Sequence, residues 1–140
     1  MILIKSEMQN QIKIWLQAWN DHSLDGVMDL IHEDVVFENW TGVIITGKKS
    51  LYRAWFPWFL HHGNFTFTLE DIFVDELEQK ALFSWQLDWP SLEKIYKGKP
   101  ESRRGVDVLH FVDGKIYKKS SYSKTTIAIE NCPVVLSAGS

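Results

Sequence analysis

The apolar residues of this 140-residue chain change their spacing near its middle. Up to about residue 61 they recur every three or four positions, which is the period of a helix with one buried face. From residue 64 onward they alternate with polar residues, which is the period of a strand. Helices followed by strands predict an α+β fold, in which the helices pack on one face of a curved antiparallel sheet.

Three helices are expected in the first part of the chain, with a strand at residues 34–38 between the second and the third. The second helix is short, and Ser23 or Asp25 is its N-cap. The third begins near Lys48 and contains Pro57, where we expect a kink or a broken helix because proline lacks the N–H donor. The first helix carries an apolar stripe made of Met8, Ile12, Trp15, Leu16 and Trp19.

The segment 81–89 alternates most regularly of all the expected strands. One face carries Phe83, Trp85, Leu87 and Trp89, and the other carries Ser84, Gln86 and Asp88. The alternation determines which side chains share a face, but not which face lies inward. The polar face is therefore either exposed to solvent or the lining of a polar cavity.

Smaller features complete the expected organisation of the strands. The alternation slips at Glu70–Asp71, which predicts a β-bulge. Asp113-Gly114 is a strong signal for a two-residue hairpin, and a last strand is expected at 116–123. We expect a single domain with its core at about residues 7–126 and a C-terminal tail at 127–140.

Composition and charge exclude several classes of protein. An aromatic content of 14% excludes disorder for most of the chain, and no apolar run approaches the roughly 20 residues that span a bilayer. A net charge of −3 is too mild to predict a nucleic-acid or membrane partner. The basic cluster at residues 94–104 favours a solvated hairpin loop over a phosphate site. The single cysteine, Cys132, excludes an intrachain disulfide, and the cytoplasm is the default compartment.

Known signatures of cofactor and metal sites are also missing from the sequence, so we expect no cofactor and no metal. The nearest pair of histidines, residues 61 and 62, is adjacent in the chain. Adjacent residues of a helix diverge, so they cannot both face one metal ion.

Asp107 is the most informative single residue, because it shares a strand face with Leu109 and Phe111. A carboxylate on an apolar face is costly unless it is paired, neutralised or facing a cavity. Two interpretations stay open. Asp107 is either a general acid/base or hydrogen-bonding anchor in a pocket, or it forms a structural salt bridge to Arg103, Arg104 or Lys119.

Several segments together carry a family resemblance. Residues 15–26 and 30–37 resemble the first helix and the following strand of the SnoaL-like branch of the NTF2-like, or ketosteroid isomerase-like, superfamily. Residues 105–116 are similar to its last hairpin, and 121–124 to a strand ending. The resemblance covers roughly residues 7–126. It implies a cone-shaped α+β barrel, whose curved sheet wraps the N-terminal helices around a pocket for a small molecule, and a homodimer formed through the outer sheet face.

The resemblance also assigns residues, one at a time. Asp107 resembles the strand aspartate of ketosteroid isomerase, while the helix tyrosine position falls on Trp15 and the position of the base falls on Asn39. Asparagine cannot accept a proton as a base. Polyketide cyclases of the family use one acidic residue in an apolar pocket, and Asp107 alone suffices for that.

By the same resemblance, the residues facing the cavity would be Asn39, Ser84, Gln86, Asp88, Leu109, Tyr117, Lys119 and Ser121. Two functions follow. The first is an enzyme of the isomerase or cyclase type, in which Asp107 transfers a proton on a partly apolar carbonyl compound and Asn39 and Trp15 orient it. The second is a non-catalytic module of the same fold that binds a small ligand or forms dimers.

Overall fold

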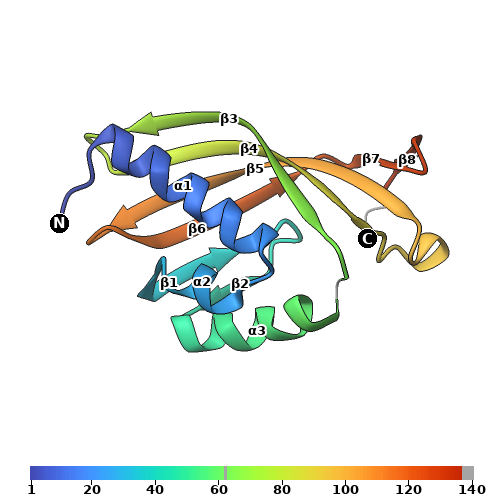
Figure 1. Ribbon diagram of the computed structural model, residues 1–140, viewed down its shortest axis with the longest axis horizontal. Coiled ribbons are helices and arrows are strands. Elements are labelled where there is room, and N and C mark those ends of the chain that lie inside the picture. The colour runs from blue at the N-terminus through green and yellow to red at the C-terminus, as the bar shows by residue number, and fades with distance from the viewer. Residues whose placement is uncertain (62, 137–140) are drawn as a thin grey trace.

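A curled sheet wraps around the N-terminal helices in the computed structural model, which describes residues 1–61 and 63–136 (Figure 1). The elements follow one another in the order α1 (Lys5–Asn20), α2 (Leu24–Met28), β1 (Ile31–Glu38), β2 (Ile44–Thr46), α3 (Lys48–His61), β3 (Thr66–Asp75), β4 (Lys80–Pro90), the 3-10 helix η1 (Lys94–Tyr96), β5 (Pro100–Val112), β6 (Lys115–Ser123), β7 (Thr126–Ile129) and β8 (Cys132–Val135). The predicted α+β class is therefore confirmed.

The strands of the described residues join into one sheet with the order β2-β1-β6-β5-β4-β3. Neighbouring strands are antiparallel except β1 and β6, which pair in parallel. The register between β3 and β4 shifts between Leu69 and Asp71, where the sequence predicts a bulge. In Figure 1, α1 crosses the sheet while α3 lies beyond β1 and β2, so the helices and the sheet surround a common interior.

The buried side of α1 is the apolar stripe expected from its helical spacing, because Met8, Ile12, Trp15, Leu16 and Trp19 are all less than a tenth exposed. The end of this helix is fixed to β3 by the Asn20 side chain, which donates to the Phe67 carbonyl and accepts from the Phe67 N–H. The two hydrogen bonds replace a sheet partner that the edge strand lacks at this point.

α3 is one helix from Lys48 to His61, so of the two alternatives expected at Pro57 the broken helix is excluded, and the kink stays a prediction. Both Pro57 and Arg53, whose carbonyl loses its helical donor, are exposed, so water can satisfy that carbonyl. The expected stop of this helix included residue 62, which lies outside the described residues.

The expectation of a tail from residue 127 is wrong for its first part, because β7 and β8 form a hairpin there. β7 pairs with Glu101 and Ser102 of β5, and its Ile127 and Ile129 are buried. Burial of alternate apolar residues is enough to hold a short strand against the sheet. Residues 137–140 of the expected tail lie outside the described residues.

Gly105 of β5 is required by close packing against its neighbours. A Cβ atom at this position would lie 2.2 Å from the Tyr122 carbonyl oxygen and 2.5 Å from an atom of the Trp85 ring. The Trp85 indole therefore packs directly against the backbone of β5, in a space that only glycine leaves.

We predict that Gly105→Ala lowers the free energy of unfolding by about 3 kcal/mol, because the backbone of β6 cannot move away from the added methyl group without breaking sheet pairing. Denaturant unfolding measures this difference, and Val106→Ala, next to it on the opposite face, should lose less. Equal stability of Gly105→Ala and the wild type would contradict the close packing.

Candidate functional site

An aromatic cavity of about 220 Å³ lies between the inner face of the sheet, α1 and α3. Its wall contains six of the seven tryptophans of the chain, which are Trp15, Trp19, Trp40, Trp55, Trp58 and Trp85. The remaining apolar lining is Leu16, Phe37, Ile45, Ala54, Phe67 and Phe83. Within the part of the chain that the structure describes, the polar lining is Asn39, Asp107, Lys119 and Ser121. Such a wall, apolar with a few grouped polar atoms, is typical of a site for a small organic molecule.

Asp107 is the centre of the polar group and is only 5% exposed. Its Oδ1 accepts a hydrogen bond from Trp85 Nε1 at 3.1 Å, and its Oδ2 lies 3.0 Å from Lys119 Nζ. Sheet pairing explains the arrangement, since Asp107 is opposite Phe83 of β4 on one side and opposite Ser121 of β6 on the other. Of the two interpretations from the sequence, the ion pair with Lys119 is present, and the carboxylate also lines a cavity.

The Lys119 ammonium is the partner of Asp107 and is as deeply buried, at 6% exposed. It donates to Ser121 Oγ at 2.7 Å, and it lies 4.7 Å from the centre of the Phe37 ring and 6.0 Å from that of Trp55. Aromatic faces attract a cation, so these two rings partly replace the water that burial removes. The pair is electrically neutral as a whole, which lowers the cost of placing it among tryptophans.

The Trp19 indole adds an unusual polar atom to the cavity wall. Among the described residues, its buried Nε1 has no hydrogen-bond partner. A buried donor without an acceptor costs about 1–3 kcal/mol. A ligand or water molecule with an acceptor at this part of the wall would remove that cost.

The structure brings together five of the residues expected at the site, since Trp15, Asn39, Asp107, Lys119 and Ser121 all line the cavity. On β4, the face that lies inward is the aromatic one, with Phe83 and Trp85 at the cavity.

Three expected lining residues of β4 are corrected, because Ser84, Gln86 and Asp88 lie on the opposite, outer face of the strand and outside the cavity. Their neighbours are other outer-face groups. Asp88 accepts hydrogen bonds from the Gln86 side chain at 3.1 Å and from the Ser102 hydroxyl. Of the two interpretations of this polar face, the cavity lining is therefore wrong, because the sheet curls with the aromatic face of β4 toward the helices.

The expected places of Leu109 and Tyr117 in the cavity lining are also wrong. Leu109 shares the inner face with Asp107 but is fully buried in the hydrophobic core, outside the cavity. Tyr117 is 37% exposed, and its ring packs on His32. The register between β5 and β6 shifts at this point, because His110 is opposite Lys118 whereas Phe111 is opposite residue 116. Tyr117 therefore has no residue opposite it on β5 and is the extra residue of a β-bulge.

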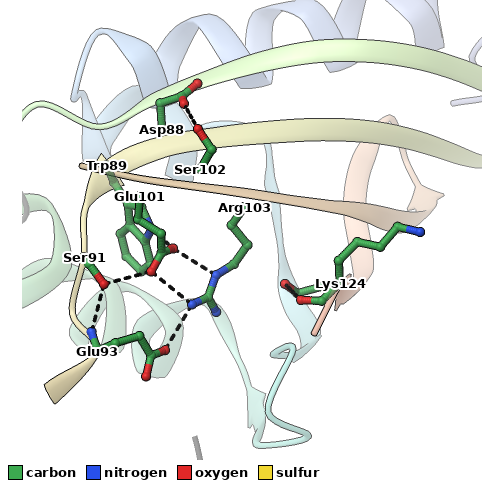
Figure 2. A network of polar contacts seen from close by, with 9 residues as sticks. Asp88, Trp89, Ser91, Glu93, Glu101, Ser102, Arg103 and Lys124 are labelled. Carbon is green, nitrogen blue, oxygen red and sulfur yellow. Dashed lines mark hydrogen bonds and ion pairs between the residues drawn. The ribbon is translucent and has the colours of Figure 1, made fainter. Parts of the chain in front are cut away.

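A second buried polar cluster lies next to the cavity and contains Glu101, Arg103, Ser91, Glu93 and Trp89 (Figure 2). Arg103 Nε is 3.1 Å from Glu101 Oε2, and Arg103 Nη2 is 3.1 Å from Glu93 Oε1. Glu101 also accepts from the Ser91 hydroxyl at 2.9 Å and from the Trp89 indole N–H. All the hydrogen-bonding capacity of this buried carboxylate is therefore directed at groups of the protein.

The cluster reaches the cavity through aromatic rings. The Arg103 guanidinium lies 5.0 Å from the centre of the Trp40 ring and 5.6 Å from that of Trp89. Trp40 lines the cavity from the turn between β1 and β2, and its ring packs on Trp85, which holds Asp107. Sequence reasoning missed this role of Arg103, because it placed the residue in a solvated basic loop.

Arg104, the neighbour of the buried Arg103 on β5, is exposed instead of buried. It lies on the exposed face, with its guanidinium 2.7 Å from Glu70 Oε2. The Arg104 hydrogen bond lowers the pKa of Glu70, and the same bond raises the pKa of Arg104. Neither arginine contacts Asp107 in the described structure, so the expected alternatives to Lys119 are excluded as its salt-bridge partner.

Within the described ranges 1–61 and 63–136, no three His, Cys, Asp or Glu residues are grouped so that they could hold a metal ion. No helix there is both long enough and apolar enough to cross a membrane. The chemistry that the cavity offers is that of one carboxylate and one ammonium group.

Comparisons with known proteins place this cavity in context. A family model described as a SnoaL-like domain matches residues 12–119. A search of curated proteins finds no match.

Among solved structures, a proposed polyketide cyclase from Xanthomonas campestris is 13% identical, with a TM-score of 0.72 over 86% of this chain and 92% of that one. A proposed ketosteroid isomerase from Kribbella flavida is 21% identical, with a TM-score of 0.66 over 85% and 78% of the two chains. A Mycobacterium tuberculosis protein in complex with estradiol-17beta-hemisuccinate is 19% identical, with a TM-score of 0.69 over 83% and 92%. At these identities the likeness establishes the shared fold.

We predict that Arg103→Met lowers the free energy of unfolding by about 3–5 kcal/mol, because it leaves Glu101 charged and buried without its cation. Arg104→Met is the matched control and should leave the unfolding midpoint almost unchanged, since its ion pair is exposed. Urea unfolding of the two variants makes the comparison. Equal stabilities would contradict the burial of the cluster.

Proposed function

We propose, because the chain belongs to the family of SnoaL-like domains, that its cavity binds a small, partly apolar carbonyl compound and that Asp107 moves a proton on it. The observation that carries this proposal is the position of Asp107, a buried carboxylate on the wall of an aromatic cavity. A charged group in such a place is costly to keep, and carboxylates of this kind are frequent at sites of proton transfer.

The geometry supports a base more strongly than an acid. The Trp85 N–H donates to Asp107 Oδ1 and the Lys119 ammonium forms an ion pair with Oδ2, and a donor and a cation at these places favour the charged carboxylate. An ionised carboxylate can accept a proton from a carbon next to a carbonyl group, provided that the carbon is held within reach. Asp107 and Lys119 are also the only titratable residues of the described cavity lining.

Two further residues are proposed to orient the substrate. Asn39 Oδ1 accepts from the Trp40 backbone N–H at 2.7 Å, which leaves the amide Nδ2 as the end available to a ligand oxygen. Trp15 lines the cavity from α1, and its ring is packed against Trp19 and Trp55. A wall of fixed rings favours a flat or partly apolar molecule. The steroid bound to the Mycobacterium tuberculosis protein agrees with a ligand of that kind.

The second candidate is a non-catalytic binding module with the same cavity. One observation favours it, namely that both oxygens of Asp107 already have partners in the protein, since Oδ1 accepts from the Trp85 N–H and Oδ2 is paired with the Lys119 ammonium. In addition, the position that resembles the isomerase base is Asn39, which cannot take a proton. The two candidates differ in whether the bound molecule exchanges protons.

We predict that the protein catalyses exchange of deuterium from heavy water into the acidic C–H positions of small aromatic ketones such as tetralone. Asp107→Asn should lower the rate at least about 100-fold, because the amide cannot accept a proton. Proton NMR follows the exchange, and Asp88→Asn, on the outer face of the neighbouring strand, is the matched control. Tight binding of ketones without any exchange would favour the binding module instead.

We further propose that the protein forms a homodimer through the outer face of the sheet and acts in the cytoplasm. Phe73, Val112 and Tyr122 are large outer-face residues that are 62%, 41% and 56% exposed. Large apolar side chains exposed on an open sheet face favour contact with another protein surface. Cys132 is a free, exposed thiol, which suits a reducing compartment.

Sedimentation equilibrium at micromolar concentration should give twice the mass of the chain. Tyr122→Lys should shift the equilibrium to the monomer, because it places a charge in the proposed contact. A wild-type protein that stays monomeric would contradict the proposed dimer.

A further inference from the structure

We propose that Lys119 is a second catalytic residue, and that it exchanges its counter-ion during the reaction. Before proton transfer it pairs with the Asp107 carboxylate, and after transfer it pairs with the oxyanion that forms on the substrate. This inference rests on the proposed function and names the group that stabilises the charge developed in it.

The hydrogen bonds of Lys119 leave room for a substrate oxygen. An ammonium group has three N–H donors. One of them is directed to Ser121 Oγ at 2.7 Å, Asp107 Oδ2 lies 3.0 Å from the nitrogen as its ion-pair partner, and no further acceptor is present among the described residues. The Trp19 Nε1 in the same wall also lacks an acceptor. The cavity therefore has more free donors than free acceptors, which predicts a ligand whose polar end is a hydrogen-bond acceptor, such as a carbonyl oxygen.

The charges of the cavity limit what can enter and what can form there. Among the described residues, the lining contains one positive and one negative group, Lys119 and Asp107. The next buried charges along β5, Glu101 and Arg103, are paired with each other, and Arg103 is also paired with Glu93. A net charge in a buried aromatic cavity is expensive. The substrate should therefore bind as a neutral molecule, and the cavity should stay neutral through the reaction.

The proton transfer satisfies this condition only if Lys119 changes partner. The Asp107 carboxylate takes a proton from the carbon next to the carbonyl group, and the electron pair of the broken C–H bond forms the carbon–carbon double bond of the enolate. The carbonyl π electrons move to the substrate oxygen, which becomes the anion. Asp107 is then a neutral carboxylic acid, and the Lys119 ammonium, the one cation of the described cavity lining, pairs with the new anion. The sum of charges is zero before and after the step.

The binding of a stable enolate tests the exchange without any turnover. Dimedone is a cyclic diketone that exists as an enolate in neutral water. If it binds to Lys119, then Asp107 must take up one proton from solution to keep the cavity neutral. We predict that the affinity of the wild-type protein for dimedone falls about tenfold per pH unit above the pKa of the free enol, and that NMR of carbon-labelled dimedone identifies the bound form as the enolate.

The variants separate the exchange from simpler explanations. Asp107→Asn resembles the protonated aspartate, so its affinity for dimedone should be independent of pH above the same pKa. Lys119→Met should lose at least about 100-fold in affinity, and the double variant Lys119→Met/Asp107→Asn should lose as much while avoiding an unpaired buried carboxylate. Lys118→Met, the exposed neighbour on the same strand, is the control and should bind like the wild type.

Three results would overturn the proposal. Wild-type affinity that does not change with pH would mean that the enolate binds beside an ionised Asp107. A tenfold fall per pH unit in Asp107→Asn as well would mean that dimedone binds as the neutral enol. If neither the wild type nor Asp107→Asn binds dimedone between about pH 5 and pH 9, an enolate site is excluded. Because none of these measurements requires turnover, they are distinct from a failure of the deuterium exchange that tests the proposed function.

Discussion

The ion pair between Asp107 and Lys119 is the interaction on which the candidate site depends. Either group alone would be a buried charge among aromatic rings, and removing one partner of such a pair costs about 3–5 kcal/mol. The pair is stable because two other polar groups complete it, the Trp85 N–H on Asp107 and the Ser121 hydroxyl on Lys119. Three neighbouring strands, β4, β5 and β6, supply these groups, so the register of the sheet and the chemistry of the cavity are determined together.

The aromatic wall gives this pair its surroundings. Most of the tryptophans of the chain come to the cavity from different elements, including α1, α3, β4 and the turn after β1. Rigid rings of this size bury a large area with little loss of conformational freedom, and they keep water away from the pair. The guanidinium of Arg103 extends the arrangement outward, since it lies against the rings of Trp40 and Trp89 while its charge is met by Glu101. Charged groups and aromatic rings thus form one packed unit from the edge of β5 to the cavity.

Much of the fold could be predicted from the sequence because it rests on local periodicity. The apolar spacing of α1 and the strict alternation of β4 both follow from the geometry of a single element. The tail was misjudged for a different reason. β7 is only four residues long, and its burial depends on pairing with β5, which is distant in the sequence. Arg103 was misjudged likewise, because the partners that bury its charge include the rings of Trp40 and Trp89, and Trp40 comes from another part of the chain.

The sequence by itself determined which residues share a face, and it singled out Asp107 as a carboxylate that an apolar strand must accommodate. The period of two and the cost of a buried charge are local facts, and they hold whatever surrounds the strand. Only the tertiary structure decided that the aromatic face of β4 lies inward, that Lys119 and neither arginine meets Asp107, and that Ser84, Gln86 and Asp88 lie outside the cavity. The physical reason is that these choices depend on the curl of the sheet and on strand register, which are properties of the whole packed chain.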